Sequence, residues 1–337
     1  GDAVAAATNL ENNQLLSTPK ARTVSVNAAT GLDFSALTAG QLTAGVGTLY
    51  TGSISLPYYL SAPAAPTDFS YLQKTWNADQ VLGSQVGEGV PPADLDGSYN
   101  VTYRYPFAAK TGDELVPLQV TLPNPATAPA ELMGATCANV RDNSGYPVVM
   151  YVHGITSDRT SVMALGHTLA SKCVATVAID LPVHGVPANS NFAAALNVEN
   201  SALIDFSALY GEDFHERHFN VVQGATGNPA LMNFDSPTAQ DGSGAWFINL
   251  ANLGNTRDNL RQSVMDLMNL NASLQAISDL DIATNGTLDT DNVTVVGASL
   301  GAIVGSVFTT VNQIAIGNDM SFGSNLNPIK GLVASVG

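Results

Sequence analysis

The stretch from residue 292 to 311, NVTVVGASLGAIVGSVFTTV, constrains the fold of this chain more than any other. It carries no charge, and glycine recurs at every fourth position, at 297, 301 and 305. Such a stretch could be a membrane-spanning helix with a small-residue face, a buried core segment, or a turn that presents a nucleophile. Its glycines, its threonines and the β-branched VTVV run favour a strand followed by a helix over one spanning helix.

The residues at the centre of this stretch, Gly297-Ala298-Ser299-Leu300-Gly301, match the pattern G-x-S-x-G. In a nucleophile elbow a serine sits on a sharp turn between a buried strand and a helix, and glycines on both sides avoid collisions. The residues before the motif predict a strand over 292–297, and those after it predict a helix over 300–314. We therefore predict that Ser299 is a nucleophile, the alternative being a packing turn rich in glycine and serine.

Acyl transfer needs two N–H donors for the developing oxyanion. The first would come from Leu300, directly after the nucleophile. A second donor is expected from the loop after an earlier strand, and His153-Gly154-Ile155 follows the apolar run YPVVMYV. We predict that Ile155 supplies this second N–H, with Gly154 allowing the turn. His153 is interpreted as a positioned structural histidine in preference to a general base.

Apolar runs and helical periodicities alternate along the second part of the chain, which predicts an α/β fold with a mostly parallel sheet. Strands are expected at 146–154, 173–182, 292–297 and 329–337, and helices at 157–172, 256–277 and 300–314. Shorter alternating pieces predict strands at 23–26 and 52–60 and a hairpin formed by 99–107 and 115–123.

The domain organisation follows from a change in composition. Residues 83–97 are rich in Gly, Pro and Asp, so a boundary is expected there between a β-rich region, 1–97, and an α/β domain, 98–337. Residues 186–250 form an insertion too long for an ordinary connection. Its apolar side chains would suit a lid or cap over a chain-like substrate, or would simply pack against the body.

Charge restricts the partners of the chain. Twelve Lys and Arg against 28 Asp and Glu give a net charge of −16, which argues against nucleic acid as a partner. Attraction to anionic lipid is disfavoured for the same reason, so peripheral contact with a membrane surface would have to be apolar. The two cysteines, Cys137 and Cys173, precede and open neighbouring core strands, and we expect a disulfide; two buried thiols are the alternative.

Several motifs in order resemble the bacterial virulence-factor lipases: VVMYVHGITSDRT, AIDLPVHG, ERHFN, DGSGAWFINLANLGNTRDNLRQSVMDL and VVGASLGAIVGS. The resemblance covers roughly residues 50–337. It implies an α/β-hydrolase fold, hydrolysis of lipid or phospholipid esters, and an extracellular or outer-membrane location in a Gram-negative bacterium. By position, Ser299 corresponds to the nucleophile and residues 153–155 to the oxyanion loop. Ala298 departs from the histidine of many relatives. No metal or organic cofactor is implied.

The other clusters of polar residues favour structural roles. The segment GEDFHERH, 211–218, lacks His-Glu-x-x-His spacing, so an ion-paired or solvated loop is preferred to a metal site. Asp180 and His184 are expected to anchor turns, and Arg257, Asp258 and Arg261 to form salt bridges.

The proton relay is incomplete in this sequence. In α/β-hydrolases the acid and the histidine follow the nucleophile, whereas the last histidine here is His218 and the only acid after Ser299 is Asp319. We expect a C-terminal segment beyond Gly337 to complete the site; the alternative recruits His153, His167 or His184 as the base.

These observations together favour a serine hydrolase acting on acyl esters of lipids or phospholipids. Two alternatives stay open: a non-catalytic surface or adhesion module with a hydrolase fold, and a peptidase on the same scaffold.

Overall fold

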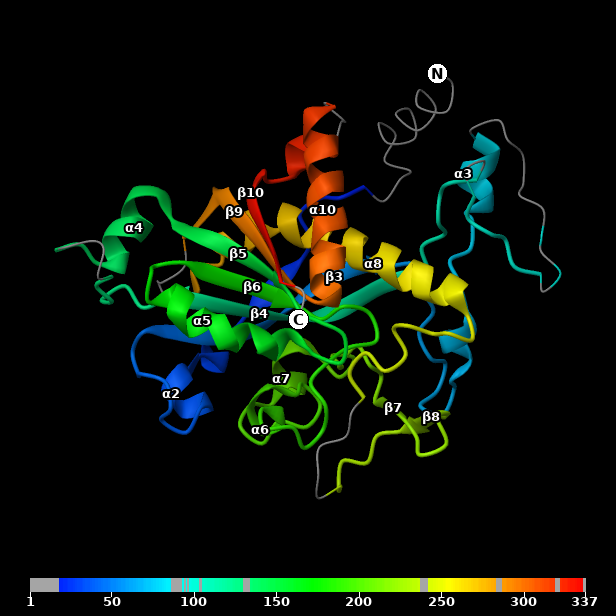
Figure 1. The fold of residues 1–337 in the computed structure, drawn as a ribbon, viewed down its shortest axis with the longest axis horizontal. Helices are drawn as coiled ribbons and strands as arrows, with labels where there is room; N and C mark the ends of the chain where they lie inside the picture. Colours follow the sequence, from blue (N-terminus) through cyan, green and yellow to red (C-terminus); the bar gives the residue numbers. More distant parts are fainter. Residues whose placement is uncertain are drawn as a thin grey trace.

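A central sheet organises the computed structural model, which describes residues 18–85, 93, 95, 97–102, 105–129, 134–236, 242–282, 287–318 and 322–335. The sheet has eight strands, in the order β1-β3-β4-β6-β5-β9-β10, with β2 paired to β3 (Figure 1). The strands are β1 (Val24–Val26), β2 (Leu32–Asp33), β3 (Gly47–Tyr58), β4 (Gly112–Pro123), β5 (Tyr146–Val152), β6 (Ala175–Ile179), β9 (Leu288–Ala298) and β10 (Ile329–Ser335).

The strands divide into a parallel and an antiparallel part. Strands β6, β5, β9 and β10 are parallel, whereas β1 to β4 pair antiparallel and β4 joins β6 antiparallel. All of β6 and nearly all of β5 are buried, as expected for apolar runs covered on both faces. This strand order and the helices between the parallel strands define an α/β-hydrolase core, which confirms the predicted fold class.

Helices cover both faces of the sheet. They include α5 (Met163–Ala170), which follows the 3₁₀ helix η3 (Arg159–Val162), and α8 (Leu253–Ala272), α9 (Leu274–Ser278) and α10 (Leu300–Gly317). Val295 packs in the same cluster as Leu267 of α8 and Phe308 of α10, whereas Val296 packs in a cluster with Leu165 of α5. Because neighbouring residues of a strand face opposite ways, α8 and α10 lie on one face and α5 on the other.

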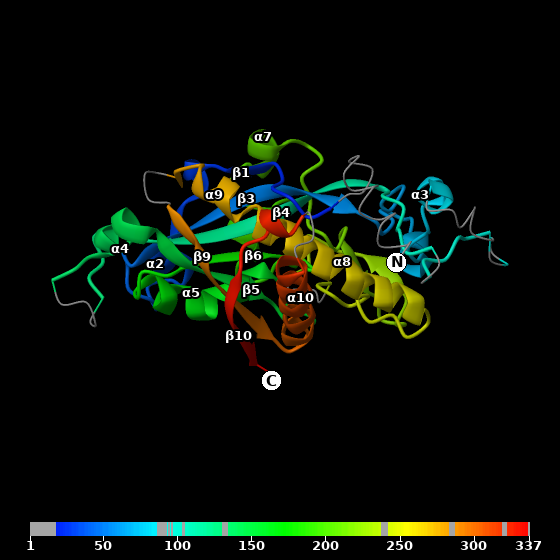
Figure 2. The ribbon, with the colours of Figure 1, turned by 90° about the horizontal axis from the view of Figure 1, so that it is seen from above.

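Right-handed crossovers explain this division. The chain moves from β5 to β6 in one direction across the sheet, and then back past β5 to β9 and on to β10. Reversing the direction of travel moves the connecting helix to the opposite face. Figures 1 and 2 both show α8 and α10 side by side.

Short elements make up the rest of the described chain. They are α2 (Phe34–Leu37), α3 (Gln80–Gln85), α4 (Cys137–Ser144), α6 (Ala193–Leu196), α7 (Phe206–Tyr210), the β7 (Val221–Gln223) and β8 (Pro229–Leu231) ribbon, and the 3₁₀ turns η1 (Ala28–Thr30), η2 (Ser70–Gln73) and η5 (Gly323–Asn325). The insertion 186–250 contains α6, α7 and the β7–β8 ribbon.

The predicted hairpin of 99–107 and 115–123 is wrong. The second segment does form β4, but β4 pairs with β3 from Tyr58↔Gly112 to Gly47↔Pro123. In the first segment the described residues contribute only an isolated bridge, between Asn77 and Asn100. Strand β3 is the better partner because it is long and almost wholly buried.

The division at residue 97 falls within one sheet. Strand β3, from the N-terminal region, lies beside β4 for twelve residues, so the two regions share the central sheet. Most of the segment 83–97, where the boundary was expected, lies outside the described residues.

Helix α10 answers the question raised by its apolar sequence. In the part of the chain that the structure describes, it is the one helix long and apolar enough to cross a membrane by length and composition. It packs along β9, β10 and α8, and one face of it is buried from Leu300 to Ala315. In this fold it is a core helix.

The expected disulfide between Cys137 and Cys173 is present, with Cα atoms 5.1 Å apart. Cys137 begins α4, and Cys173 precedes β6 in a left-handed backbone conformation with φ of 61°. The bridge ties α4 to the turn between α5 and β6.

Removing this bridge should destabilise the protein markedly. The cysteines are 36 positions apart, and closing a loop of that length restricts the unfolded chain by about 4 kcal/mol. We expect the double variant Cys137→Ala/Cys173→Ala to lose about this much free energy of unfolding in urea, and reduced wild type to behave similarly. Two free thiols in the denatured, non-reduced protein would contradict the bridge.

Candidate active site

Ser299 lies at the turn between β9 and α10, in an unusual backbone conformation. Its φ is 50° and its ψ is −114°, a region that non-glycine residues rarely occupy and that costs about 1–3 kcal/mol. Its N–H donates to the carbonyl oxygen of Ser335, at the end of β10, at 2.7 Å. The residue is exposed. The turn thus holds a strained, accessible serine at the carboxyl edge of the parallel strands.

The glycines beside Ser299 are required by close backbone contacts. A Cβ on Gly301 would lie 2.0 Å from the carbonyl oxygen of Val152, and one on Gly297 would lie 2.3 Å from the carbonyl oxygen of Gly301. Both distances are far inside van der Waals contact. The first turn of α10 can therefore approach β5 only because position 301 has no side chain.

The loop after β5 lies directly against the serine. A Cβ on Gly154 would be 3.3 Å from the Cβ of Ser299, so the backbone at this position runs beside the candidate nucleophile. Among the described residues, the N–H groups of Ile155 and Leu300 have no hydrogen-bond acceptor. Leu300 is the first residue of α10, where N–H groups are unpaired by helix geometry. The two predicted donors are thus available next to Ser299.

His153 has a structural role in this arrangement. Its ring is fully buried, with Nδ1 2.8 Å from the carbonyl oxygen of Gly154 and Nε2 accepting the N–H of Leu181 at 2.9 Å. These contacts assign the proton to Nδ1 and use both ring nitrogens. Burial lowers the pKa of His153, although the nearby charge of Asp180 opposes that shift. The ring holds the loop and is not available as a base.

His184 packs behind the same loop. Its ring lies 4.7 Å from that of His153 and 5.2 Å from that of Phe247, centre to centre. Nδ1 is 2.9 Å from the carbonyl oxygen of Pro182, whereas the buried Nε2 faces Gly244 and has no hydrogen-bond partner among the described residues. Burial, and then the neighbouring His153, lower its pKa well below the usual value.

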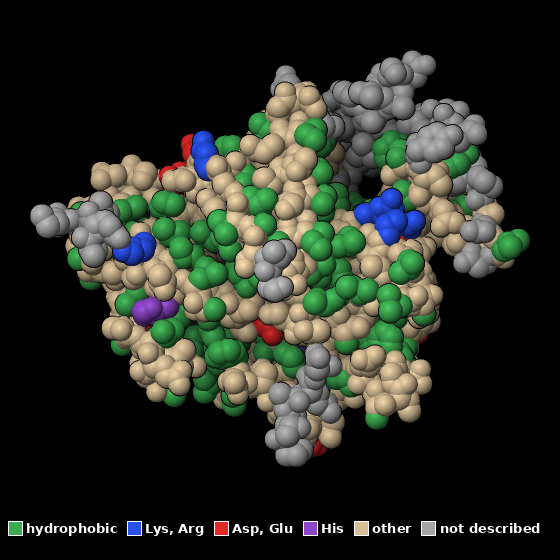
Figure 3. Space-filling model, viewed as in Figure 1, with side chains coloured by type: hydrophobic (Ala, Val, Ile, Leu, Met, Phe, Trp, Pro, Cys, Tyr) green, Lys and Arg blue, Asp and Glu red, His purple; other side chains and the backbone are tan. Residues whose placement is uncertain are grey.

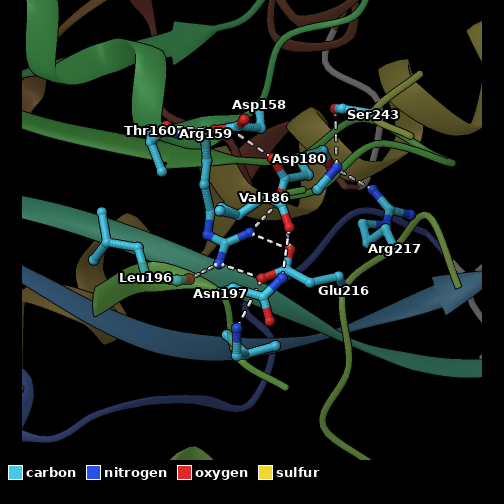
Figure 4. A network of polar contacts seen from close by, with 12 residues as sticks. Asp158, Arg159, Thr160, Asp180, Val186, Leu196, Asn197, Glu216, Arg217 and Ser243 are labelled. Carbon is cyan, nitrogen blue, oxygen red and sulfur yellow. Dashed lines mark hydrogen bonds and ion pairs between the residues drawn. The ribbon is translucent and has the colours of Figure 1, made fainter. Parts of the chain in front are cut away.

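A buried arginine ties the loop to the insertion (Figure 4). Arg159, at the start of η3, binds Glu216 through two nitrogens, at 2.7 and 2.9 Å, and also pairs with the carboxylate of Asp180. Its backbone N–H donates to the same Asp180 at 2.6 Å. Burial alone would raise the pKa of Asp180, but the charge of Arg159, the neighbouring His153 and the hydrogen bonds from Arg159 together lower it. The carboxylates hold the segment after loop 153–155 in place.

A second buried arginine extends this network. Arg217 donates to Glu114 of β4 at 2.8 Å and to the carbonyl oxygen of Asp180 at 2.6 Å. Its Nη2 also lies 2.9 Å from a carboxylate oxygen of Asp266 on α8. Burial raises the pKa of Asp266 to about 6, against the attraction of Arg217. Glu216 and Arg217 therefore fasten the insertion to three elements of the body.

These contacts identify the segment 211–218 as an ion-paired element, the interpretation preferred from sequence. Within the described residues, no group of three His, Cys, Asp or Glu side chains could hold a metal ion. The expected salt bridges on α8 are also present: Asp258 pairs with Arg257 at 2.8 Å and with Arg261 at 3.0 Å.

A base for Ser299 does not emerge from the described residues, in which the Ser299 hydroxyl makes no hydrogen bond to a histidine. His167 lies 3.1 Å from the carbonyl oxygen of Thr43, and both ring nitrogens of His218 contact backbone groups. Asp319, the one acid after the serine, lies outside the described residues.

Sequence reasoning missed how Arg159, Glu114 and Asp266 take part in the site. Their partners are 57, 103 and 49 positions away along the chain, so no local spacing announces them. The available signal was weak: charged residues inside otherwise apolar segments at the carboxyl edge of the sheet.

Comparisons with known proteins add little to this picture. No family model matches the chain, so its likeness to the virulence-factor lipases stays a resemblance, and no curated protein matches it. Among solved structures it is similar to an acetyl xylan esterase from Paenibacillus sp. R4, with a TM-score of 0.34, 11% identity and coverage of 91% of this chain and 54% of that one.

Two further structures are similar at the same low level. For the esterase LipW from Mycobacterium marinum the TM-score is 0.25 and the identity 13%, with 65% of this chain and 38% of that one covered. For EstA from Aspergillus niger the TM-score is 0.22 and the identity 12%, with 85% of this chain and 37% of that one covered. The chain spans about half or less of each. Similarity of this degree does not establish an activity.

Buried neutral histidines should make stability depend on pH. Because the pKa of His184 is lowered in the folded state, unfolding below about pH 6.5 adds a proton to it, and stability falls as the pH falls further. We expect His184 to lower the free energy of unfolding by about 1 kcal/mol for each pH unit below this point. His184→Asn, which keeps an N–H donor, should show a shallower loss between pH 6.5 and 5 in urea unfolding.

Comparing how the free energy of unfolding varies with pH in wild type and in His184→Asn separates the effect of His184 from that of other groups. Burial raises the pKa of both Asp158 and Asp266 to about 6, and these carboxyls change stability in the opposite sense over the same range. Their effect is common to wild type and variant. Equal slopes in the two proteins would show that His184 is not buried in its neutral form.

Proposed function

We propose that this chain is the core of a serine hydrolase that cleaves carboxylic acyl esters, with Ser299 as the nucleophile. One observation carries the proposal: Ser299 occupies a strained turn between a parallel strand and a helix, with the backbone of Gly154 packed against it. A packing turn has no need of a strained, exposed serine. Strain of this kind is typical of functional sites.

The chemistry follows from the groups around the serine. The Ser299 oxygen attacks the ester carbonyl, and the negative charge that develops on the carbonyl oxygen is stabilised by the N–H groups of Leu300 and Ile155. The partial positive charge at the start of α10 favours the same anion. Collapse releases the alcohol and leaves an acyl-enzyme, which water then hydrolyses. Each oxyanion donor contributes roughly 100- to 1,000-fold to the rate.

The substrate class in this proposal is a lipid or phospholipid ester. The resemblance to virulence-factor lipases supports it, as does the apolar surface around α10 (Figure 3), and both suit apolar contact with a membrane surface outside the cell. No cofactor is part of the reaction. A peptidase would use the same serine, and an adhesion module would not use it at all.

Ser299 should react with a serine-directed probe in the complete protein. We expect a fluorophosphonate to label Ser299, and Ser299→Ala to abolish both labelling and ester hydrolysis. Ser306→Ala is a matched control, because Ser306 lies on the same helix and its hydroxyl donates to the carbonyl oxygen of Ala302. Mass spectrometry of the labelled peptide locates the site.

Two outcomes would count against this assignment. Hydrolysis at the wild-type rate by Ser299→Ala would remove Ser299 from the mechanism. A complete protein that is never labelled would favour the adhesion module.

We propose further that a segment beyond Gly337 supplies the acid and the histidine of the relay. Two observations support this: among the described residues, no histidine is hydrogen-bonded to Ser299 and β10 pairs with β9 alone. Leu332 and Val333 on β10 are exposed, unlike the residues of β5 and β6. An unpaired apolar edge strand favours the addition of another strand.

On this proposal, residues 1–337 alone should be nearly inactive on short-chain esters, because the oxyanion donors are present without a base. Purified 1–337 would be assayed with p-nitrophenyl acetate beside a protein extended beyond Gly337. Full activity of 1–337 that is lost on substituting a single histidine would overturn the proposal. Such a result would instead identify that histidine as the base.

A further inference from the structure

A cavity of about 560 Å³ lies between α8 and α10, on the face of the molecule shown in Figure 3. Val264 and Met268 line it from α8, Ile303 and Val307 from α10, and Trp76 from the N-terminal region. Its size is within the range of small-molecule sites. Apart from Arg261, its lining carries no charge.

The α10 side of this groove is a row of exposed apolar residues. Ile303, Val307 and Val311 are spaced four residues apart and are 58%, 48% and 38% exposed. This spacing puts them on one stripe of the helix. Polar Thr310 is also exposed on α10 but does not line the groove. Ile303, Val307 and Val311 therefore face the groove beside α8, whereas Ile314, which is 52% exposed on the same helix, lies outside it.

The groove begins near the start of α10, although Ser299 itself is not among its lining residues. Ile303 follows Ser299 by four residues, about one helical turn, and the groove continues along α10 as far as Val311. The eight helical steps from Ile303 to Val311 rise about 12 Å. That length matches an extended alkyl chain of about ten carbon atoms with bonds of ~1.5 Å.

The lining also restricts the chemistry of the occupant. The Arg261 charge is matched by Asp258 at 3.0 Å, and its guanidinium lies 6.0 Å from the centre of the Trp76 ring. Of the other lining residues only Thr102 and Trp76 carry a polar side-chain atom. An extended peptide would need partners for its N–H and C=O groups, whereas an alkyl chain needs none.

We propose that this groove binds the acyl chain of the ester whose carbonyl group lies at Ser299. The proposal rests on the proposed function and adds a preference for medium or long acyl chains. Each additional methylene group buried in the groove should improve affinity about fourfold, until the chain passes Val311.

Binding can be tested without turnover. In the Ser299→Ala protein, the methyl esters of pyrene-labelled dodecanoic and butanoic acids would be titrated by fluorescence. We expect the dodecanoyl probe to bind at least tenfold more tightly. Val307→Glu, which puts a charge into the groove at a half-exposed position, should weaken its binding at least tenfold. Thr310→Glu, the matched control on the same helix, should change binding less than twofold.

Circular dichroism and thermal midpoints would show that both variants fold. A second variant, Val307→Phe, fills the groove partway along and should shift the optimal chain length to shorter esters. The inference is overturned if the two probes bind equally, or if Val307→Glu and Thr310→Glu bind the dodecanoyl probe alike. It is also overturned if wild type is a dimer that Val307→Glu converts to a monomer, since a second copy would then cover the groove.

These outcomes are independent of the outcome for the nucleophile. Chain-length-dependent binding with the expected variant response, but no labelling of Ser299, would remove the proposed reaction and keep the groove. Labelling of Ser299 without any response of probe binding to Val307→Glu would keep the proposed reaction and remove the groove as the acyl-chain site.

Discussion

Two arginines with almost no exposed surface, Arg159 and Arg217, join the insertion to the sheet, and the geometry of the site depends on them. Arg159 follows loop 153–155 and binds Glu216 of the insertion, while Arg217 of the insertion binds Glu114 and Asp266 of the body. Removing one member of such a pair leaves a buried charge without its partner, which costs about 3–5 kcal/mol. The insertion is therefore anchored at these residues, and any lid-like movement would have to involve other parts of it.

A second constraint acts on the backbone next to the serine. The first turn of α10, the end of β5 and the end of β10 converge there: Gly301 contacts the Val152 carbonyl, and the Ser299 N–H is bound by Ser335. A side chain at position 301 would push α10 off β5, and the serine would lose its place beside Gly154. The packing of α10 on the sheet and the placement of the candidate nucleophile thus depend on the same glycines, which have no Cβ atom.

Features set by residues close together in the sequence could be predicted, whereas those that depend on residues far apart along the chain could not. The parallel strands, α8, α10 and the elbow at Ser299 follow from local runs, periodicity and glycine spacing. The pairing of β4 with β3 did not, because the hairpin signal at 99–107 is local whereas β3 precedes β4 by more than fifty residues. The ion pairs of Arg159 and Arg217 could not be predicted for the same reason, because their partners lie far away along the chain. The division at residue 97 followed a real change in composition, but β3, which precedes residue 97, pairs with β4, which follows it, so both regions belong to the central sheet.

The site is consequently asymmetric. On the side of β5 and β6, loop 153–155 is held by buried rings and ion pairs, so the proposed donor at Ile155 would be fixed before substrate arrives, which is the condition under which such donors are most effective. On the side of α10 and β10, the groove, the exposed stripe and the unpaired strand edge are all open. On the proposals made above, substrate and the residues that complete the relay would approach Ser299 from this open side, because described residues already fill the other side. In the proposed reaction, Ser299 would thus have a rigid loop on the side where negative charge develops and an open groove on the side where the ester binds.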